Sequence, residues 1–277
     1  MPAVPPLARG LVVACHPLPC LAVTAFAVGW AVVVGLPAGR VGLVALAVLL
    51  GQLSIGWCND AVDAGRDLAA GRRDKPVPAG LVTAGQLRIA AGVALLACAV
   101  ASLALGVAAG VVHLVAVASG WAYDLVLKPT PASPLPYAVS FGLLPAVATL
   151  AAAPPHWPPA GVLAGAALLG TGAHFANTVG DAEHDAATGV RGLPQRIGPT
   201  ASLRVSALLV ALAAVALLTA DRDAGGVTLV LLVAGALVAV AGAALAGRMV
   251  GRGRTAFRLT LAAVALVIAG FLLGGSG

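Results

Sequence analysis

Charged residues are scarce in this chain. Only 9% of its 277 residues are Asp, Glu, Lys or Arg, whereas 60% are hydrophobic and the mean hydropathy is +1.02. A soluble domain of this length carries roughly a quarter charged residues. The shortage excludes a water-soluble protein and indicates that lipid surrounds most of the chain. Because each membrane crossing needs about 20 apolar residues, no room remains for a separate soluble domain, and we expect one membrane domain over residues 1–277.

Two other features are missing from the sequence. The chain has only four cysteines, and none follows the C-x-x-C spacing of a zinc or redox site, so we interpret them as small apolar filler. Residues 1–10 also lack a charged leader followed by a short apolar run and a cleavage site. We therefore expect no removable signal peptide.

Apolar runs of spanning length alternate with charged or Pro/Gly-rich segments. These runs predict an all-α integral membrane fold with nine transmembrane helices. The predicted helices cover residues 15–36, 40–59, 86–106, 108–127, 135–153, 160–179, 202–220, 226–247 and 257–274.

The basic residues support this count. If the N-terminus is cytoplasmic and the helices alternate, 14 of the 16 Lys and Arg residues fall on the inner side, and only Arg40 and Arg222 lie outside. This is the asymmetry of the positive-inside rule, and it puts the C-terminus outside. The net charge of +6 thus reflects topology, and we expect no nucleic-acid partner. The excess of arginine over lysine is typical of GC-rich genomes and favours a bacterial plasma membrane.

A polar pattern, N-x-x-x-D-x-x-x-D, occurs twice, at residues 59–67 and 177–185, which we call the first motif and the second motif. Residues four apart on a helix lie one above another, so each motif predicts a ladder of oxygen ligands on one helix face. The ladders are Asn59, Asp63 and Asp67, with Asp60 adjacent, and Asn177, Asp181 and Asp185.

Carboxylates stacked in this way repel one another, and acids near a membrane core are costly, so a counter-charge is needed. Mg²⁺ binds one or two carboxylates and completes its shell with water and phosphate oxygens, and the ladders therefore predict a magnesium-bound diphosphate. Basic residues near both motifs can hold the diphosphate oxygens. A simpler interpretation is that charges gather at helix ends because they meet water there. The matching repeat, each copy ending a predicted even-numbered helix, favours the binding site.

Both motifs resemble those of the UbiA superfamily of intramembrane prenyltransferases, including the segment Arg-Arg-Asp-Lys-Pro-Val-Pro-Ala-Gly at 72–80 and the Gly189, Arg191 and Leu193-Pro194 positions after the second motif. The resemblance implies nine helices around a central cavity, two Mg²⁺ ions held by the aspartates, and an isoprenyl diphosphate whose tail points toward lipid. One departure concerns a Tyr-x-x-x-Lys element: here Tyr123 and Lys128 are five residues apart, and Asp124 stands four before Lys128.

Together these arguments give a set of candidate residues. We expect catalysis from Asp63, Asp67, Asp181, Asp185 and Lys128. We expect diphosphate binding by Asn59, Arg72, Lys75, Lys128, Asn177 and Arg191. We expect metal ligation by Asp60, Asp63, Asp67, Asp181 and Asp185.

Aromatic side chains near the inner helix ends are candidates to shield a carbocation, or they are ordinary packing. They are Trp57, Trp121, Tyr123, Phe141 and Phe175. His174 is either a contact to the acceptor or, as we favour, a buried hydrogen-bonded histidine. We interpret His16, between Cys15 and Pro17, as part of a helix start.

The predicted function is transfer of an isoprenyl group from its diphosphate to an aromatic or lipophilic acceptor within the membrane. One alternative is a UbiA-type terpene cyclase, which uses the same diphosphate without an acceptor. A distant alternative is an ion-coupled transporter with repeated acidic motifs. The acids lie at helix ends beside phosphate-binding bases, which favours the enzyme. The sequence leaves the acceptor and the prenyl chain length open.

Overall fold

The computed structural model describes residues 6–181, 185, 188–220, 225–244 and 253–274, and within these ranges every regular element is a helix. The helices are α1 (Pro6–Ala14), α2 (Pro17–Val33), α3 (Ala38–Ala69), α4 (Ala84–Ala104), α5 (Val107–Ala122) with the π-helical turn η1 (Tyr123–Leu127), α6 (Pro134–Leu150), α7 (Ala160–Gly180), α9 (Leu193–Ile197), α10 (Pro199–Ala220), α11 (Gly226–Ala244) and α13 (Gly253–Gly274). The all-α membrane fold class is confirmed.

Each of the nine predicted apolar runs coincides with a long helix in the described part of the chain, with η1 completing the fourth. Five of these helices are individually long and apolar enough to cross a membrane, or six if the bent pair α1 and α2 is one span. The count of nine crossings therefore stays a prediction. The structure adds α1, which the sequence pattern did not indicate.

Helix ends follow local chemistry. Pro17 and Pro19 begin α2 after His16, whose φ of 52° lies in the left-handed region, and α1 and α2 meet at 61°. Helix α4 starts with a capping box. The Thr83 hydroxyl accepts a hydrogen bond from the backbone N–H of Gln86, and the Gln86 side-chain oxygen accepts one from the backbone N–H of Thr83. These breaks turn the chain at the edge of the apolar layer.

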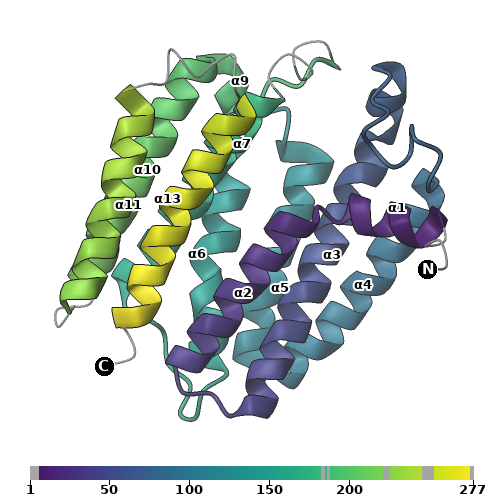
Figure 1. Ribbon diagram of the computed structural model, residues 1–277. Helices are drawn as coiled ribbons and strands as arrows, with labels where there is room; N and C mark the ends of the chain where they lie inside the picture. Colours follow the sequence, from purple (N-terminus) through teal and green to yellow (C-terminus); the bar gives the residue numbers. More distant parts are fainter. Residues whose placement is uncertain (1–5, 182–184, 186–187, 221–224, 245–252, 275–277) are drawn as a thin grey trace, which may run out of the picture.

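The long helices run side by side in one bundle (Figure 1), and the contacts between them close into a ring. Helix α2 packs against α3 and α6, α5 against α6, α6 against α7, and α13 against both α7 and α2. Trp30 of α2 stacks on Phe271 of α13 with 4.9 Å between ring centroids, which closes the ring. The ring positions the functional residues at one end of the bundle.

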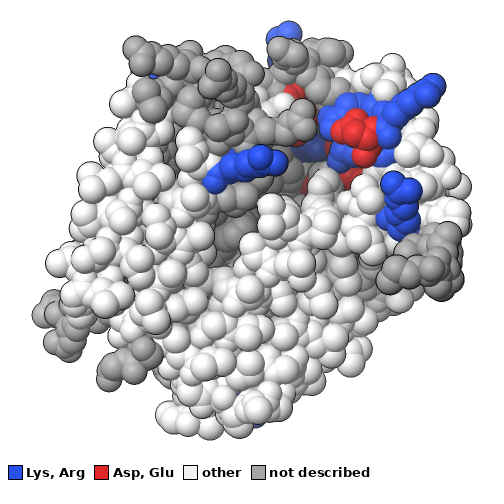
Figure 2. All heavy atoms as spheres, in the orientation of Figure 1, with Lys and Arg blue, Asp and Glu red and all other residues white. Residues whose placement is uncertain are grey.

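The outer surface divides into two regions. Large apolar side chains on the flanks of the bundle are exposed, such as Leu96 at 71% and Val100 at 73% on α4. The charged side chains gather at the end where α3 and α7 finish, whereas the flank and the opposite end in this view are almost entirely uncharged (Figure 2). A surface of this kind suits a bilayer along its sides, and the chain is a multi-pass membrane protein.

Candidate active site

The first motif lies on one continuous helix. The predicted second span ended at residue 59, but α3 continues to Ala69, so Asn59, Asp63 and Asp67 do share one helix face. All three line a cavity of about 330 Å³ that opens at the charged end of the bundle. The predicted ladder is thus present in the first motif.

The second motif departs from the prediction. Helix α7 ends at Gly180, and Asp181 follows it with φ −107° and ψ 6°, so Asn177, Asp181 and Asp185 do not stand on one uninterrupted helix. The backbone N–H of Asp185 donates to the carbonyl of Asp181 at 2.8 Å. Asn177, Asp181 and Asp185 all line the same cavity as the first motif. Glu183, His184, Arg222, Arg248 and Arg252 lie outside the described residues.

Basic side chains pair with carboxylates in both motifs. Asp63 accepts hydrogen bonds from Arg66 and Lys128, and Asp181 accepts one from Arg72 at 3.4 Å. Asp185 is buried and accepts a hydrogen bond from the Gln195 side chain at 2.8 Å. Lys128 and Arg72 therefore sit where they were predicted, whereas Arg66 and Gln195 were missed because pairing depends on the fold.

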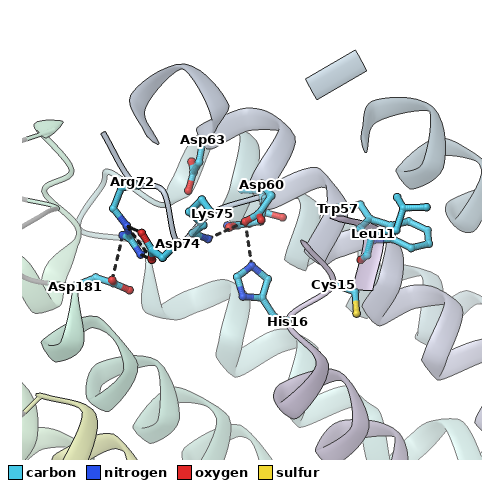
Figure 3. Close-up of polar contacts among 12 residues, drawn as sticks. Leu11, Cys15, His16, Trp57, Asp60, Asp63, Arg72, Asp74, Lys75 and Asp181 are labelled. Carbon is cyan, nitrogen blue, oxygen red and sulfur yellow. Dashed lines mark hydrogen bonds and ion pairs between the residues drawn. The ribbon is translucent and has the colours of Figure 1, made fainter. Parts of the chain in front are cut away.

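Asp60 is placed differently from the other aspartates. Its side chain is 2% exposed and does not line the cavity. One oxygen, Oδ1, accepts from Lys75 Nζ at 2.8 Å and contacts His16 Nε2 at 3.1 Å (Figure 3). Asp60 is thus a partner for two side chains that do line the cavity, Lys75 and His16, and its role as a metal ligand stays a prediction.

Two further candidates have clear positions. Asn177 is exposed at the cavity, as expected for a ligand of a bound substrate. Arg191 is exposed and is not among the cavity residues, and its carbonyl accepts a hydrogen bond from Arg196. Its diphosphate contact stays a prediction.

Arg72 links the loop after the first motif to the second motif. Its Nε and Nη2 donate to the Asp74 carboxylate at 3.1 and 2.7 Å, while Nη1 reaches Asp181 (Figure 3). The hydrogen bonds to Asp74 raise the pKa of the Arg72 guanidinium, and Arg72 in turn lowers the pKa of the Asp74 carboxyl. Both groups are therefore charged at neutral pH.

The turn η1 accounts for the unusual spacing of Tyr123 and Lys128. The backbone N–H of Lys128 donates to the carbonyl of Tyr123 at 2.9 Å, a bond across five residues instead of the four of an α-helix. The wider turn absorbs the extra residue, so Tyr123 and Lys128 both line the cavity despite their spacing. Asp124 lines it as well.

Aromatic rings cover the deeper part of the cavity. Tyr123 and Phe141 line it as predicted, and Tyr137, which the sequence analysis missed, lies between them with its ring 5.1 Å from that of Tyr123. Tyr137 also stacks on His174, with 4.4 Å between centroids. Trp57, Trp121 and Phe175 are outside the set of cavity-lining residues, so packing is the better interpretation for them.

The two histidines also have defined roles. His174 is 1% exposed, and its Nε2 lies 3.2 Å from Ser133 Oγ, which confirms the favoured interpretation of a buried hydrogen-bonded residue. His16 does more than start a helix, since it lines the cavity opposite α6. Its left-handed backbone turns the side chain back toward Asp60.

The donor set fits magnesium held together with a phosphate ligand. Among the described residues, no three His, Cys, Asp or Glu side chains lie close enough together to ligate one ion. Mg²⁺ does not require three, because it uses one or two carboxylates and takes water and phosphate oxygens for the remaining positions. Asp63, Asp67, Asp181 and Asp185 supply hard oxygen ligands around one cavity, and their basic partners suit the phosphate.

Comparison with known proteins agrees with this geometry. The sequence pattern of the UbiA prenyltransferase family matches residues 18–259. A structure described as providing insights into digeranylgeranylglyceryl phosphate synthase in membranes shares 16% identity and a TM-score of 0.73, covering 97% of this chain and 98% of its own. None of the curated proteins matches the sequence.

Two archaeal structures are similar as well. A UbiA homologue from Aeropyrum pernix K1 shares 19% identity and a TM-score of 0.73, over 96% of this chain and 98% of that one. A UbiA homologue from Archaeoglobus fulgidus, determined with GPP and Mg²⁺ bound, shares 16% identity and a TM-score of 0.69, over 97% of this chain and 100% of that one. At these identities the similarity establishes the fold.

Proposed function

Because this chain belongs to the UbiA prenyltransferase family, we propose that it transfers an isoprenyl group from an isoprenyl diphosphate to an aromatic or lipophilic acceptor inside the membrane, with two Mg²⁺ ions bound by the motif aspartates. The main support for this proposal is the set of residues that line one cavity. Carboxylates from both motifs and four Lys or Arg side chains surround its mouth, and aromatic rings line its deeper part.

The cavity mouth suits a diphosphate. Arg72 and Lys75 enter it from the loop between α3 and α4, and Lys128 enters it from the end of η1. Each of the three is paired with a carboxylate. When a diphosphate binds together with divalent cations, these ion pairs can be replaced. The carboxylates then bind the metal, and the basic side chains bind the phosphate oxygens. When bound, magnesium neutralises the charge that the leaving diphosphate develops. The bases contribute to the same stabilisation.

The deeper cavity suits the hydrocarbon part of the substrate. Breaking the allylic C–O bond leaves positive charge on carbon, and the faces of Tyr123, Tyr137 and Phe141 attract such charge while excluding water. Val23 and Ile55 continue the lining with aliphatic carbon. The isoprenyl tail therefore belongs in this part of the cavity, below the diphosphate.

The proposed placement in the membrane follows from the charged end. We assign this end, with the loops at 70–83 and 181–192, to the cytoplasmic side of a plasma membrane, with the N-terminus cytoplasmic and the C-terminus outside. The support is the basic asymmetry of the connecting segments. Prenyl diphosphates made in the cytoplasm would reach the cavity mouth directly.

The direct test is release of pyrophosphate from a panel of isoprenyl diphosphates of different length by the purified protein, with and without Mg²⁺. The parent is compared with Asp63→Ala, Asp181→Ala and the control Asp74→Asn, whose carboxylate lies near the mouth but outside the cavity lining. Release should require Mg²⁺ and both motif aspartates, and should survive in the control. Products are identified by mass spectrometry with a lipid and aromatic acceptor extract.

The outcomes separate the competing functions. A prenylated acceptor supports the transferase, whereas a cyclised hydrocarbon formed without acceptor supports the terpene cyclase. If no diphosphate is consumed in any combination, the enzyme proposal is wrong. Ion flux measured in vesicles would then become the next experiment.

A further inference from the structure

Asp124 is a buried acid that the diphosphate site does not use. Its side chain is 5% exposed, and its Oδ1 accepts a hydrogen bond from the Asn59 side-chain amide at 2.8 Å. Its other oxygen, Oδ2, is buried and has no hydrogen-bond partner among the described residues. Asp124 is one of the residues that line the cavity, so its buried carboxyl group lies beside the cavity. An unpaired buried oxygen is costly unless a ligand uses it.

The π-helical turn brings Tyr123 to the cavity wall beside this acid. In a regular α-helix, residues five apart lie on different faces, so Tyr123 and Lys128 would not both face one cavity. The five-residue bond from Lys128 to Tyr123 brings these two residues to the same side, and Asp124 remains on that wall beside Tyr123. Single π-helical turns occur frequently at functional sites.

The depth of Asp124 matches the position of the reacting carbon. Its partner Asn59 lies one helical turn before Asp63, about 6 Å farther from the charged end of α3. The reacting allylic carbon is bonded to an oxygen of the diphosphate. It must therefore lie just below the carboxylates that hold the diphosphate. The Tyr123 ring lies on the same turn of chain as Asp124.

We propose that Asp124 is the catalytic base that removes the proton which the acceptor loses when the isoprenyl group is attached. The proposal rests on the prenyl-transfer function above. In this step the allylic C–O bond breaks, and its electron pair leaves with the diphosphate. An electron pair of the acceptor forms the new bond to the allylic carbon. The acceptor proton goes to Asp124 Oδ2, and its bonding pair stays on the acceptor.

The geometry also restricts the acceptor. The reacting atom must carry a hydrogen, as a hydroxyl group or an activated aromatic ring carbon does. A carboxylate as the nucleophile would bring a second negative charge next to Asp124 and would have no proton to give. The hydrogen bond from Asn59 holds the Asp124 carboxylate in place and leaves the Asn59 carbonyl oxygen available to the site.

The decisive variant is Asp124→Asn, which keeps the size of the side chain and an oxygen that accepts from Asn59. The reaction contains geranyl diphosphate, Mg²⁺ and either a neutral phenol or a long-chain alcohol, and both pyrophosphate and organic products are measured. Pyrophosphate release should stay within about threefold of the parent. Prenylated acceptor should fall about 10²- to 10⁴-fold, the usual contribution of a general base, and geraniol from water should replace it.

Asp124→Glu provides the matching variant, because it retains a carboxylate. It should form at least about tenfold more prenylated product than Asp124→Asn if the group acts as a base. If Asp124→Asn loses pyrophosphate release and prenylated product equally, the residue belongs to the ionisation site and the proposal is overturned. Normal product formation in Asp124→Asn would also overturn it. Pyrophosphate release by the parent protein is measured before any variant. If the parent releases none, the proposed function itself is refuted.

Discussion

Two substitutions of Arg72 distinguish the effect of its positive charge from the effect of its forked guanidinium group. Arg72 spans the cavity mouth, with two nitrogens on Asp74 and a third on Asp181. Lysine at this position keeps the positive charge, but its single ammonium group cannot contact both carboxylates as the planar guanidinium does. Glutamine removes the charge as well. We expect catalytic efficiency to fall in the order parent, Arg72→Lys, Arg72→Gln.

The magnitude follows from the contacts that are lost. A hydrogen bond to a charged group contributes about 1.5 to 3 kcal/mol. If one such bond to the diphosphate is lost in the transition state, kcat/KM for the isoprenyl diphosphate falls about 10- to 150-fold in Arg72→Lys, since each 1.36 kcal/mol is a factor of about ten. Loss of the charge should reduce it further in Arg72→Gln. The assay is initial-rate pyrophosphate release at saturating Mg²⁺ over a range of substrate concentration.

Asp74→Asn is the control for an indirect role. It removes the charged partner of Arg72 but leaves the guanidinium at the cavity, and Asp74 itself is exposed and does not line the cavity. The control should change kcat/KM by less than about threefold, as expected for an exposed ion pair. If Asp74→Asn loses as much activity as Arg72→Gln, Arg72 acts by fixing its loop, and the assignment to the diphosphate is refuted.

Other predictions test packing, ligand binding and topology. A Cβ at Gly192 would lie 2.8 Å from the Lys128 carbonyl oxygen and from the Ser133 hydroxyl. Gly192→Ala should therefore destabilise the protein by about 1 to 3 kcal/mol, measured by thermal unfolding in detergent. The control Gly180→Ala should be neutral, because the space around Gly180 is open. Equal melting temperatures would contradict this packing. Inorganic pyrophosphate with Mg²⁺ at about 100 times the dissociation constant should stabilise the parent by about 2.7 kcal/mol, and stabilisation without Mg²⁺ would argue against a shared site. In intact cells, an impermeant maleimide should label His156→Cys and spare Ala70→Cys, and the reverse pattern would invert the proposed orientation.

Much of the fold and the outline of the site could be predicted from the sequence, because both depend on local patterns. The long apolar runs identify helices wherever lipid is the solvent, and each predicted run coincides with a helix among the described residues. The four-residue spacing of Asn59, Asp63 and Asp67 places them on one face of α3. The Pro and Gly residues around helix ends were less informative, since α1 went unnoticed and α7 ends one residue before Asp181.

The individual partners within the site could not be predicted. Asp60 and Asp63 are three residues apart, yet Asp60 turns toward His16 and Lys75 while Asp63 lines the cavity. The side chain of Tyr137 gives no sequence signal, because it is one aromatic residue in an apolar helix. Its place beside Tyr123 exists only when α6 packs against α5.

Composition and helical periodicity were enough to identify an all-α membrane protein with two aspartate motifs, because composition sets the solvent and periodicity sets which residues share a face. Only the tertiary structure decided which face meets the cavity, because lipid-facing and protein-facing sides of a membrane helix are both apolar. It also decided how the five-residue spacing from Tyr123 to Lys128 is accommodated. The hydrogen bond of η1 does this, and the same turn brings Tyr123 to the cavity wall beside Asp124.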